Sequence, residues 1–435
     1  FSPFGDTAIQ FSFDNGPEFR LVAVSEQQFI NPVDSQWAQL YSNMAFIGLN
    51  AYSSAGLTNM RNLSVFVNKG KKVRLLPISS PIVLPSSPDG ASNYAPDIFI
   101  DTLLDPVHGI GEYIDPANIS SCIDLEQLAI SKRFCQQQGY FMDGVIADRQ
   151  SWRSFWTEVA PYSLLELARI GGKETLVPAV PINNDGSITR NITISALFNQ
   201  GNILEDSYKE DFIDYGESNQ DLIATIVYRS QENDQPFPRN SSLTISLKDI
   251  NPSISQRQTF DLSNWVTNYN QALHYGMLLV SQKRFSKRAI EFKTFPTEAP
   301  ISPGSYIYVQ LEENKWDDLY TGTVLDNGTL NIPFDTTNIN GTFPTLIYKP
   351  GSNPYKQNIV YASGQSSTLS DLKGTGALFV LGTSAPARRV FRVISVAMEE
   401  EGEITVSAVE HQCEELSGET KSLIARFDPL LYSID

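Results

Sequence analysis

Two apolar runs separated by a short acidic turn constrain the fold of this chain most directly. Residues 391–398 and 404–409 carry the alternating and clustered β-branched pattern of half-buried strands. Gly402 lies between them and can adopt the positive φ that a hairpin loop needs. The sequence therefore predicts a β-hairpin whose turn carries four carboxylates. They belong to Glu399, Glu400, Glu401 and Glu403.

The composition is that of a globular chain with an acidic surface. Its 435 residues include 25 Pro, 27 Gly and 41% hydrophobic residues, which indicates buried cores joined by many turns. The formal net charge of −17 repels nucleic acid and anionic lipid over about 8 Å at physiological salt. The sequence lacks an apolar run of about 18 residues, so no membrane-spanning helix is predicted. Because it starts with Phe1, we expect a portion of a longer or processed protein.

Helical signals concentrate in the first half of the chain. In 124–138, Asp124 is a predicted N-cap and Gln127 follows three residues later, which is the spacing of a capping box. Over 151–162, apolar residues recur at i, i+3, i+4 and i+7, and this stripe predicts a helix that Pro161 ends.

Turn residues and alternating runs predict β-structure on both sides of these helices. The segment 62–76 reads as strand, turn and strand, and 164–180 as a hairpin across a Gly-Gly turn. A further helix is predicted over 261–282. We expect 205–220 to be an acidic loop and 327–374 to be a long insertion loop.

Side chains suited to catalysis are scarce. The three histidines, His108, His274 and His411, lack a metal-ligand spacing such as HExxH. The adjacent acids Asp317 and Asp318 would suit a glycosidase only at the right separation, and we interpret them as part of a solvated loop. The sequence contains no phosphate-binding loop and no G-x-S-x-G elbow, and its three cysteines form no CxxC pair. We therefore predict no catalytic residue, no metal site and no cofactor.

Several stretches follow one another in an informative order. They are NMRNLSVFVNKGKKVRL (59–75), SNYAPDIFIDTLLDPVHGIGEYIDPANI (92–119), DLEQLAISKRFCQQQGYFMDGVIADRQSWRSFWTEVA (124–160), GGKETLVP (171–178), NQALHYGMLLVSQKRFSKRAIEFKTFP (270–296), ISPGSYIYV (301–309) and RVFRVISVAMEEEGEITVSAVEH (389–411). In this order, over roughly residues 60–415, the chain resembles the central portion of the tail tip attachment protein family of long-tailed bacteriophages (the protein J family). These proteins are relatives of the baseplate hub proteins of contractile tails. Ser305 stands where the family's Pro-Gly-Asp turn usually has Asp.

The resemblance implies a structural hub at the distal end of the tail of a virion. Such a hub is a homotrimer that closes the tail tube, adapts it to the receptor-binding tip and opens for DNA ejection. The implied partners are distal tail or tube proteins, the tape measure protein, and receptor-binding or tail fibre proteins. DNA would pass through without specific binding, and no catalysis is required.

The resemblance also implies an α+β fold class, mostly β, with a multidomain tail-hub architecture. We expect a β domain over 1–80 as part of the hub and an α+β peripheral domain over 81–205. A tube-like β-α-β domain is expected over 206–300, and a β-barrel-like domain over 301–435.

A DNA-conducting channel suggests a role for the acidic turn. Basic groups in such a channel would hold phosphates, and each contact would add salt-dependent affinity. We therefore hypothesise that Glu399, Glu400, Glu401 and Glu403 face the lumen; a solvated outer turn is the plainer alternative. Two other functions stay open. One is a tail-associated cell-wall hydrolase, and the other is a host-glycan-binding adhesin that uses some of the 18 Tyr and 5 Trp.

Overall fold

A computed structural model describes most of the chain from residue 72 onward and four strands before it. The described residues are 9–12, 19–24, 46–51, 64–67, 72–106, 109–113, 118–146, 150–213, 221–230, 239–253, 255–296, 301–310, 319–331, 341–362, 365–382, 389–399, 402–416 and 419–435. The chain divides into two compact units. The first comprises Phe1–Leu75, Pro85–Ser92 and Gln231–Arg239, and the second comprises Leu76–Leu84, Asn93–Ser230 and Asn240–Asp435.

In the first unit the described residues form antiparallel strand pairs. The pairs are β1 (Ile9–Ser12) with β4 (Ser64–Val67), β2 (Phe19–Val24) with β3 (Phe46–Ala51), and β5 (Lys72–Val73) with β6 (Gly90–Ala91). The two strands predicted within 62–76 are present as β4 and β5, and each pairs with a strand from elsewhere in the chain.

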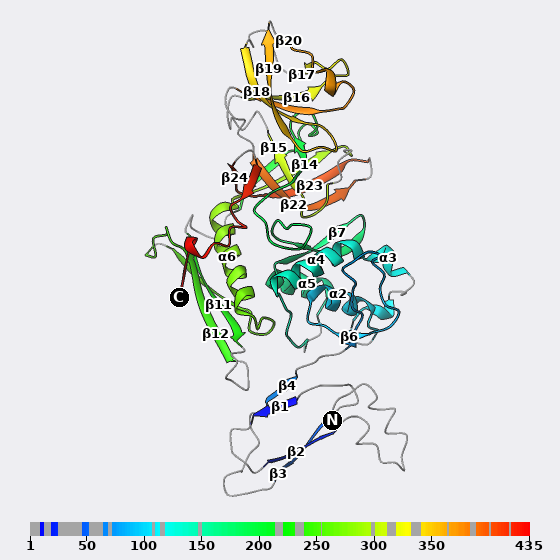
Figure 1. The fold of residues 1–435 in the computed structure, drawn as a ribbon, viewed down its shortest axis with the longest axis vertical. Coiled ribbons are helices and arrows are strands. Elements are labelled where there is room, and N and C mark those ends of the chain that lie inside the picture. The colour runs from blue at the N-terminus through cyan, green and yellow to red at the C-terminus, as the bar shows by residue number, and fades with distance from the viewer. Residues whose placement is uncertain are drawn as a thin grey trace. The chain divides into compact units, whose positions relative to one another are not determined.

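The second unit contains a helical body, in which helices pack on a β-hairpin (Figure 1). Its elements are α2 (Ala95–Leu104), α3 (Ile119–Cys122), α4 (Leu125–Gln138), α5 (Trp152–Val159), a 3₁₀ turn (Ala160–Ser163), β7 (Leu165–Ile170) and β8 (Lys173–Pro178). The capping prediction for α4 is confirmed, because Asp124 accepts a hydrogen bond of 3.0 Å from the Gln127 amide. The predicted β7–β8 hairpin is also confirmed, and Gly171 and Gly172 both adopt positive φ in its turn.

A buried ion pair fixes the point where the chain enters the helical body. Lys132 on α4 lies 2.9 Å from Asp97 on α2, and both side chains are buried. Asp97 accepts a hydrogen bond from the Leu76 amide at 2.9 Å, while Lys132 donates one to the Leu76 carbonyl at 2.7 Å. Because buried charges need partners, this arrangement satisfies both charges and both backbone groups of Leu76 together.

The six-stranded sheet that we call the central sheet has the order β10-β14-β23-β22-β15-β9. Its strands are β9 (Ile194–Phe198), β10 (Lys209–Phe212), β14 (Arg288–Thr294), β15 (Tyr306–Val309), β22 (Arg389–Met398) and β23 (Ile404–Glu410). Strand β15 is buried on both faces, with Tyr306 and Tyr308 in one core and Ile307 and Val309 in another. This explains its apolar run without alternation. The loop prediction for 205–220 is wrong for β10, a charged strand at the sheet edge, where charge discourages further pairing.

A second six-stranded sheet packs on one face of the central sheet through a shared core. Its order is β17-β16-β21-β18-β19-β20, with β16 (Leu319–Val324), β17 (Leu330–Asn331), β18 (Gly341–Tyr348), β19 (Tyr355–Ala362), β20 (Gln365–Ser366) and β21 (Leu378–Gly382). Four of these strands fall within 327–374, so the prediction of a long insertion loop is wrong there.

A four-stranded sheet, which we call the α6 sheet, carries the long helix α6 (Tyr269–Phe285) on one face (Figure 1). Its order is β13-β11-β12-β26, with β11 (Leu222–Ser230), β12 (Arg239–Leu247), β13 (Gln256–Asp261) and β26 (Tyr432–Ile434). The helix predicted over 261–282 begins later, at Tyr269. Asp261 caps a turn by accepting from the Ser263 amide, and Asn268 is the true N-cap.

The fold class is the predicted one, α+β and mostly β, with several sheets in a multidomain chain. Strand pairing crosses all three expected domain boundaries, and the β5–β6 pair already joins 1–80 to 81–205. The central sheet combines strands from 81–205, 206–300 and 301–435, and the last strand of the chain completes the α6 sheet. Between β23 of the central sheet and β26 of the α6 sheet, the chain forms a small hairpin of β24 (Cys413–Leu416) and β25 (Glu419–Ser422).

Candidate functional site

The β22–β23 hairpin forms as predicted and presents the acidic turn at its tip. The strands are antiparallel, and their last pair is Met398 with Ile404. Gly402 adopts φ +79° in open space, where its own amide donates to the Glu399 carbonyl at 3.2 Å. The Glu399 amide donates to the Glu403 carbonyl at 2.8 Å, which closes the turn.

Two of the four predicted turn carboxylates are described, and each has a local partner. Glu399 accepts a hydrogen bond from the Thr405 hydroxyl at 2.9 Å. Glu403 forms an ion pair of 3.1 Å with Lys293 on the neighbouring strand β14. Glu400 and Glu401 lie outside the described residues. The turn is therefore anchored to two strands, and one of its charges is balanced by a lysine.

Large apolar side chains that the sequence patterns did not predict as exposed flank this turn. Met398 is 77% exposed, and Phe295, which follows the end of β14, is 59% exposed. Strands β14, β23 and β22 are adjacent, so the two residues lie at the same end of the central sheet. Phe295 directly follows Thr294, the buried last residue of β14, and Met398 ends β22 two residues after the partly buried Val396.

The opposite end of the same strands carries a charge cluster of two glutamates and two arginines. Arg288 forms ion pairs with Glu210 on β10 and, at 3.9 Å, with Glu410 on β23. Arg389 on β22 reaches Glu410 at 2.7 Å. Burial and the neighbouring Glu210 raise the pKa of Tyr208, which donates to that carboxylate at 3.1 Å. The cluster joins four neighbouring strands, so its described contacts hold these strands together.

A hydrogen-bonded Ser–His pair lies in the interior beside the central sheet. His411 Nε2 and Ser422 Oγ are 2.6 Å apart, and both residues are buried. Burial, reinforced by the positive charge of Arg392, lowers the pKa of His411 to about 3. Ser422 Oγ also accepts from the Ala425 amide at 3.1 Å. A nucleophile must meet its substrate, and this buried hydroxyl instead bonds to the His411 imidazole and to the Ala425 amide.

Arg392 ties the central sheet to the helical body. Its guanidinium donates to Glu166 on β7 at 2.6 Å and to the Pro178 carbonyl at the end of β8 at 2.8 Å. The side chain is buried, so these contacts hold the β7–β8 hairpin against β22 with little solvent screening.

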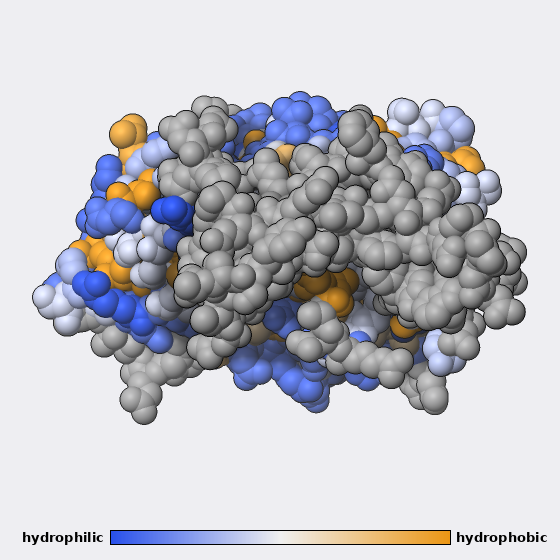
Figure 2. Space-filling model, turned by 90° about the horizontal axis from the view of Figure 1, so that it is seen from below, coloured by the Kyte–Doolittle hydropathy of each residue, from blue (hydrophilic) through white to orange (hydrophobic). Residues whose placement is uncertain are grey.

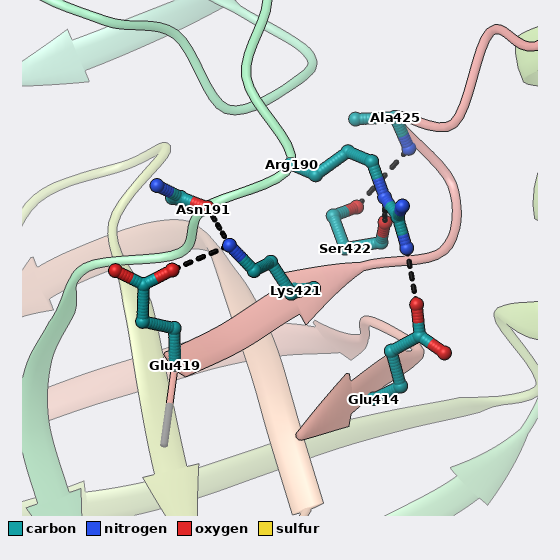
Figure 3. Close-up of polar contacts among 7 residues, drawn as sticks. All are labelled: Arg190, Asn191, Glu414, Glu419, Lys421, Ser422 and Ala425. Carbon is teal, nitrogen blue, oxygen red and sulfur yellow. Dashed lines mark hydrogen bonds and ion pairs between the residues drawn. The ribbon is translucent and has the colours of Figure 1, made fainter. Parts of the chain in front are cut away.

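The β24–β25 hairpin is fixed to the segment that enters β9 (Figure 3). Arg190 pairs with Glu414 and donates to the Ser422 carbonyl at 3.4 Å. Lys421 pairs with Glu419 and donates to the Asn191 side chain at 2.7 Å. Backbone hydrogen bonds from the Ser422 amide to the Arg190 carbonyl and from the Ile192 amide to the Thr420 carbonyl complete this attachment.

The other sequence candidates are dispersed. His108, Asp317 and Asp318 lie outside the described residues. His274 on α6 stacks on Phe427 and hydrogen-bonds to Tyr140, as an interior histidine does. None of the three cysteines, all of which the structure describes, forms a disulfide. Among the described residues, no group of acidic, histidine or cysteine side chains is placed to hold a metal ion.

The acidic composition predicts a hydrophilic surface. On the face in Figure 2 the coloured residues are mostly hydrophilic, with small scattered hydrophobic patches. Among the described helices, none has the length and apolar character needed to cross a membrane.

Comparisons with known proteins give similarity at the level of solved structures. No protein-family model matches the chain, and no curated protein matches it. A chain from the virion of a native gene transfer agent particle aligns with a TM-score of 0.43 and 13% identity, covering 93% of this chain and 74% of that one. A tail protein from Neisseria meningitidis MC58 aligns with a TM-score of 0.25 and 6% identity, covering 62% of this chain and 58% of that one.

Proposed function

We propose that the protein is a structural component of a phage-type tail, and more specifically the hub that closes the distal end of the tail tube. One observation carries the proposal. The stretches that resemble the tail tip attachment protein family occur in the family's order, and most of them coincide with elements of this fold. The resembling stretches include α2, α4, β8 with the turn before it, α6 with β14, β15, and the β22–β23 hairpin.

The polar contacts suit a component that works by holding geometry. Ion pairs join β10, β14, β22 and β23, and Arg392 joins the central sheet to the helical body. We propose that the chain carries out no reaction and needs no cofactor. In this role it forms a homotrimer and contacts tube proteins, the tape measure protein and receptor-binding or fibre proteins, while DNA passes without specific binding.

The acidic turn at 399–403 keeps its proposed place facing the DNA channel. Only Glu403 of the described turn carboxylates has an ion-pair partner among the described residues. The turn therefore presents net negative charge, which disfavours phosphate contacts.

Immunogold electron microscopy of the source particles, with antibody against this chain, tests the proposal. We expect gold at the distal end of a tail, and pre-immune serum on the same particles as control leaves that end bare. Gold at another position on the tail would keep the tail role and remove the hub role. Absence of labelled tailed particles would overturn both, and hydrolysis of host envelope and binding to host glycan would then be measured.

A further inference from the structure

The second half of strand β22 has a neighbouring strand on one side only. Strand β15 pairs with β22 only as far as Arg392. Two backbone hydrogen bonds of 2.8 Å at Val393 end that contact. Strand β22 continues to Met398 and stays paired with β23. Within the described part of the chain, residues 394–398, which we call the open edge, therefore lack a strand on the side away from β23.

The local backbone explains why the pairing with β15 stops. The register between β22 and β23 shifts between Val393 and Ser395, which leaves Ile394 as a β-bulge. Bulges bend a strand and commonly end its pairing. On the other strand, the Ser305 amide donates to the Ser302 carbonyl at 2.9 Å, so the chain turns directly before β15. The residues before β15 therefore do not continue along the open edge.

The open edge is accessible. Ile394 is 43% exposed and Met398 is 77% exposed. Ser395 and Ala397 are exposed as well, and only Val396 is partly buried. Exposure on both faces of the strand leaves room for another strand to lie beside it.

The open edge also lacks the charges that protect other strand edges. Natural sheets use charged side chains at their edges to prevent pairing with another chain. Strand β10, an edge of the same sheet, follows this rule with Lys209, Glu210 and Asp211. The open edge has the sequence Ile-Ser-Val-Ala-Met and carries no charge. It is therefore suited to strand addition, in which an extended segment of another chain pairs with a free edge.

The face of the hairpin that carries the core favours apolar residues in the added strand. Val396 lies opposite Val406 and Met398 lies opposite Ile404, and directly opposite residues share one face of a sheet. Val406 is buried in the core on this face, and Val396 and Ile404 pack against it. Apolar residues at alternate positions of an added strand would extend this core and cover Met398.

The charges around the open edge favour a basic partner over a second copy of the chain. Glu399 directly follows the edge, is exposed and has no ion-pair partner among the described residues. The net charge of −17 makes two copies repel each other over about 8 Å at physiological salt. A cationic side chain placed beside Glu399 would instead be attracted.

We propose that the open edge binds an extended segment of a partner protein by antiparallel strand addition. The segment carries apolar residues opposite Val396 and Met398 and begins with a lysine or arginine opposite Glu399. Antiparallel pairing places the first residue of the added strand at the end of β22. The site follows from contacts within the chain and stands independently of the proposed tail role.

Hydrogen–deuterium exchange of the full chain, resolved by mass spectrometry, tests the site with a synthetic peptide. The probe is Lys-Val-Thr-Val-Thr-Val, acetylated and amidated at its ends. We expect amide exchange in 394–398 to slow by about threefold at about 2 mM peptide, which corresponds to a Kd of about 1 mM. The matched control peptide Glu-Val-Thr-Val-Thr-Val should slow it less, because its first residue is repelled by Glu399. Exchange in the charged edge strand β10 should stay unchanged with both peptides.

Glu399→Lys provides the decisive variant, because it should reverse the preference between the two peptides, which a folding defect would not do. Unchanged exchange in 394–398 with both peptides would overturn the proposal, and so would equal slowing in β10. Equal slowing by both peptides in both proteins would overturn the basic partner. Without peptide, slowing in 394–398 that grows with protein concentration would assign the edge to a second copy and overturn the proposed partner.

Discussion

The neighbouring strands β14 and β23 carry a cation–carboxylate pair at each end, and the two pairs differ in burial. At the tip, Lys293 and Glu403 are 3.1 Å apart, with 44% and 22% of their side chains exposed. At the base, the side chain of Glu410 is 4% exposed and is shared by Arg288 and Arg389. Similar chemistry thus serves a solvated turn at one end and an interior tie at the other. Burial, more than residue type, decides what each carboxylate contributes.

The largest expected effect tests this contrast directly with matched truncations. Glu410→Ala removes the partner of Arg389, Arg288 and Gln412, and we expect it to lower the free energy of unfolding by about 3 kcal/mol. Glu403→Ala at the tip should cost about 0.5 kcal/mol, because its ion pair is screened by solvent. Urea unfolding of both variants measures the difference. Equal losses would show that the two ends are energetically alike.

Protonation of His411, beside the base of the hairpin, gives a second and smaller effect, which makes the free energy of unfolding depend on pH. His411 directly follows β23, and its pKa falls to about 3 because of burial and the charge of Arg392. An unfolded histidine binds its proton near pH 6.5, so the unfolded state gains protons first as pH falls. Stability from this group is complete above about pH 6.5 and is lost toward pH 3.

We expect this group to remove about 2 kcal/mol between pH 7 and pH 5. His411→Gln, which keeps a hydrogen-bonding side chain beside Ser422, should reduce the pH dependence of the unfolding free energy by that amount. Burial also lowers the pKa of His274, so its contribution has the same sign and remains in both proteins. If the pH dependence of the unfolding free energy is unchanged in His411→Gln, the His411 side chain is accessible to water in the folded protein.

The tip of the hairpin was predictable from the sequence, and the base was not. Alternating residues and Gly402 define the turn locally. The cluster around Glu410 depends on strand β10, whose residues Lys209 to Phe212 carry no apolar alternation because they form a sheet edge. Partners such as Glu210 come from far along the chain, and register between distant strands is not written in local patterns.

Elsewhere the same division between local and long-range signals applies. The cap of α4 at Asp124 needs only neighbouring residues, and its prediction was confirmed. The start of α6 was misplaced because two capping residues, Asp261 and Asn268, compete within a few positions. Strand β26 was missed because it exists only through its pairing with β12.

The smallest expected effect on stability concerns the turn at the tip. There, a change in the rate of DNA ejection without a large change in the free energy of unfolding would indicate a role in function. Glu399→Lys with Glu403→Lys should change the free energy of unfolding by less than about 1 kcal/mol, because the turn is solvated and its backbone bonds remain. If the turn faces a DNA channel, particles that carry the variant should eject DNA more slowly at low salt. High salt should restore the rate, since phosphate contacts weaken as salt rises.

Glu419→Lys is the matched control for this double reversal, because it changes an exposed carboxylate on β25 away from the turn. Ejection from particles of both variants can be followed by the fluorescence of a DNA-binding dye after release is triggered. A salt-sensitive delay seen only in the double variant would extend the contrast between tip and base, since the tip charges would then act on DNA and the base charges on the fold. Identical ejection in the two variants would place the acidic turn on the outside and leave it a solubilising role.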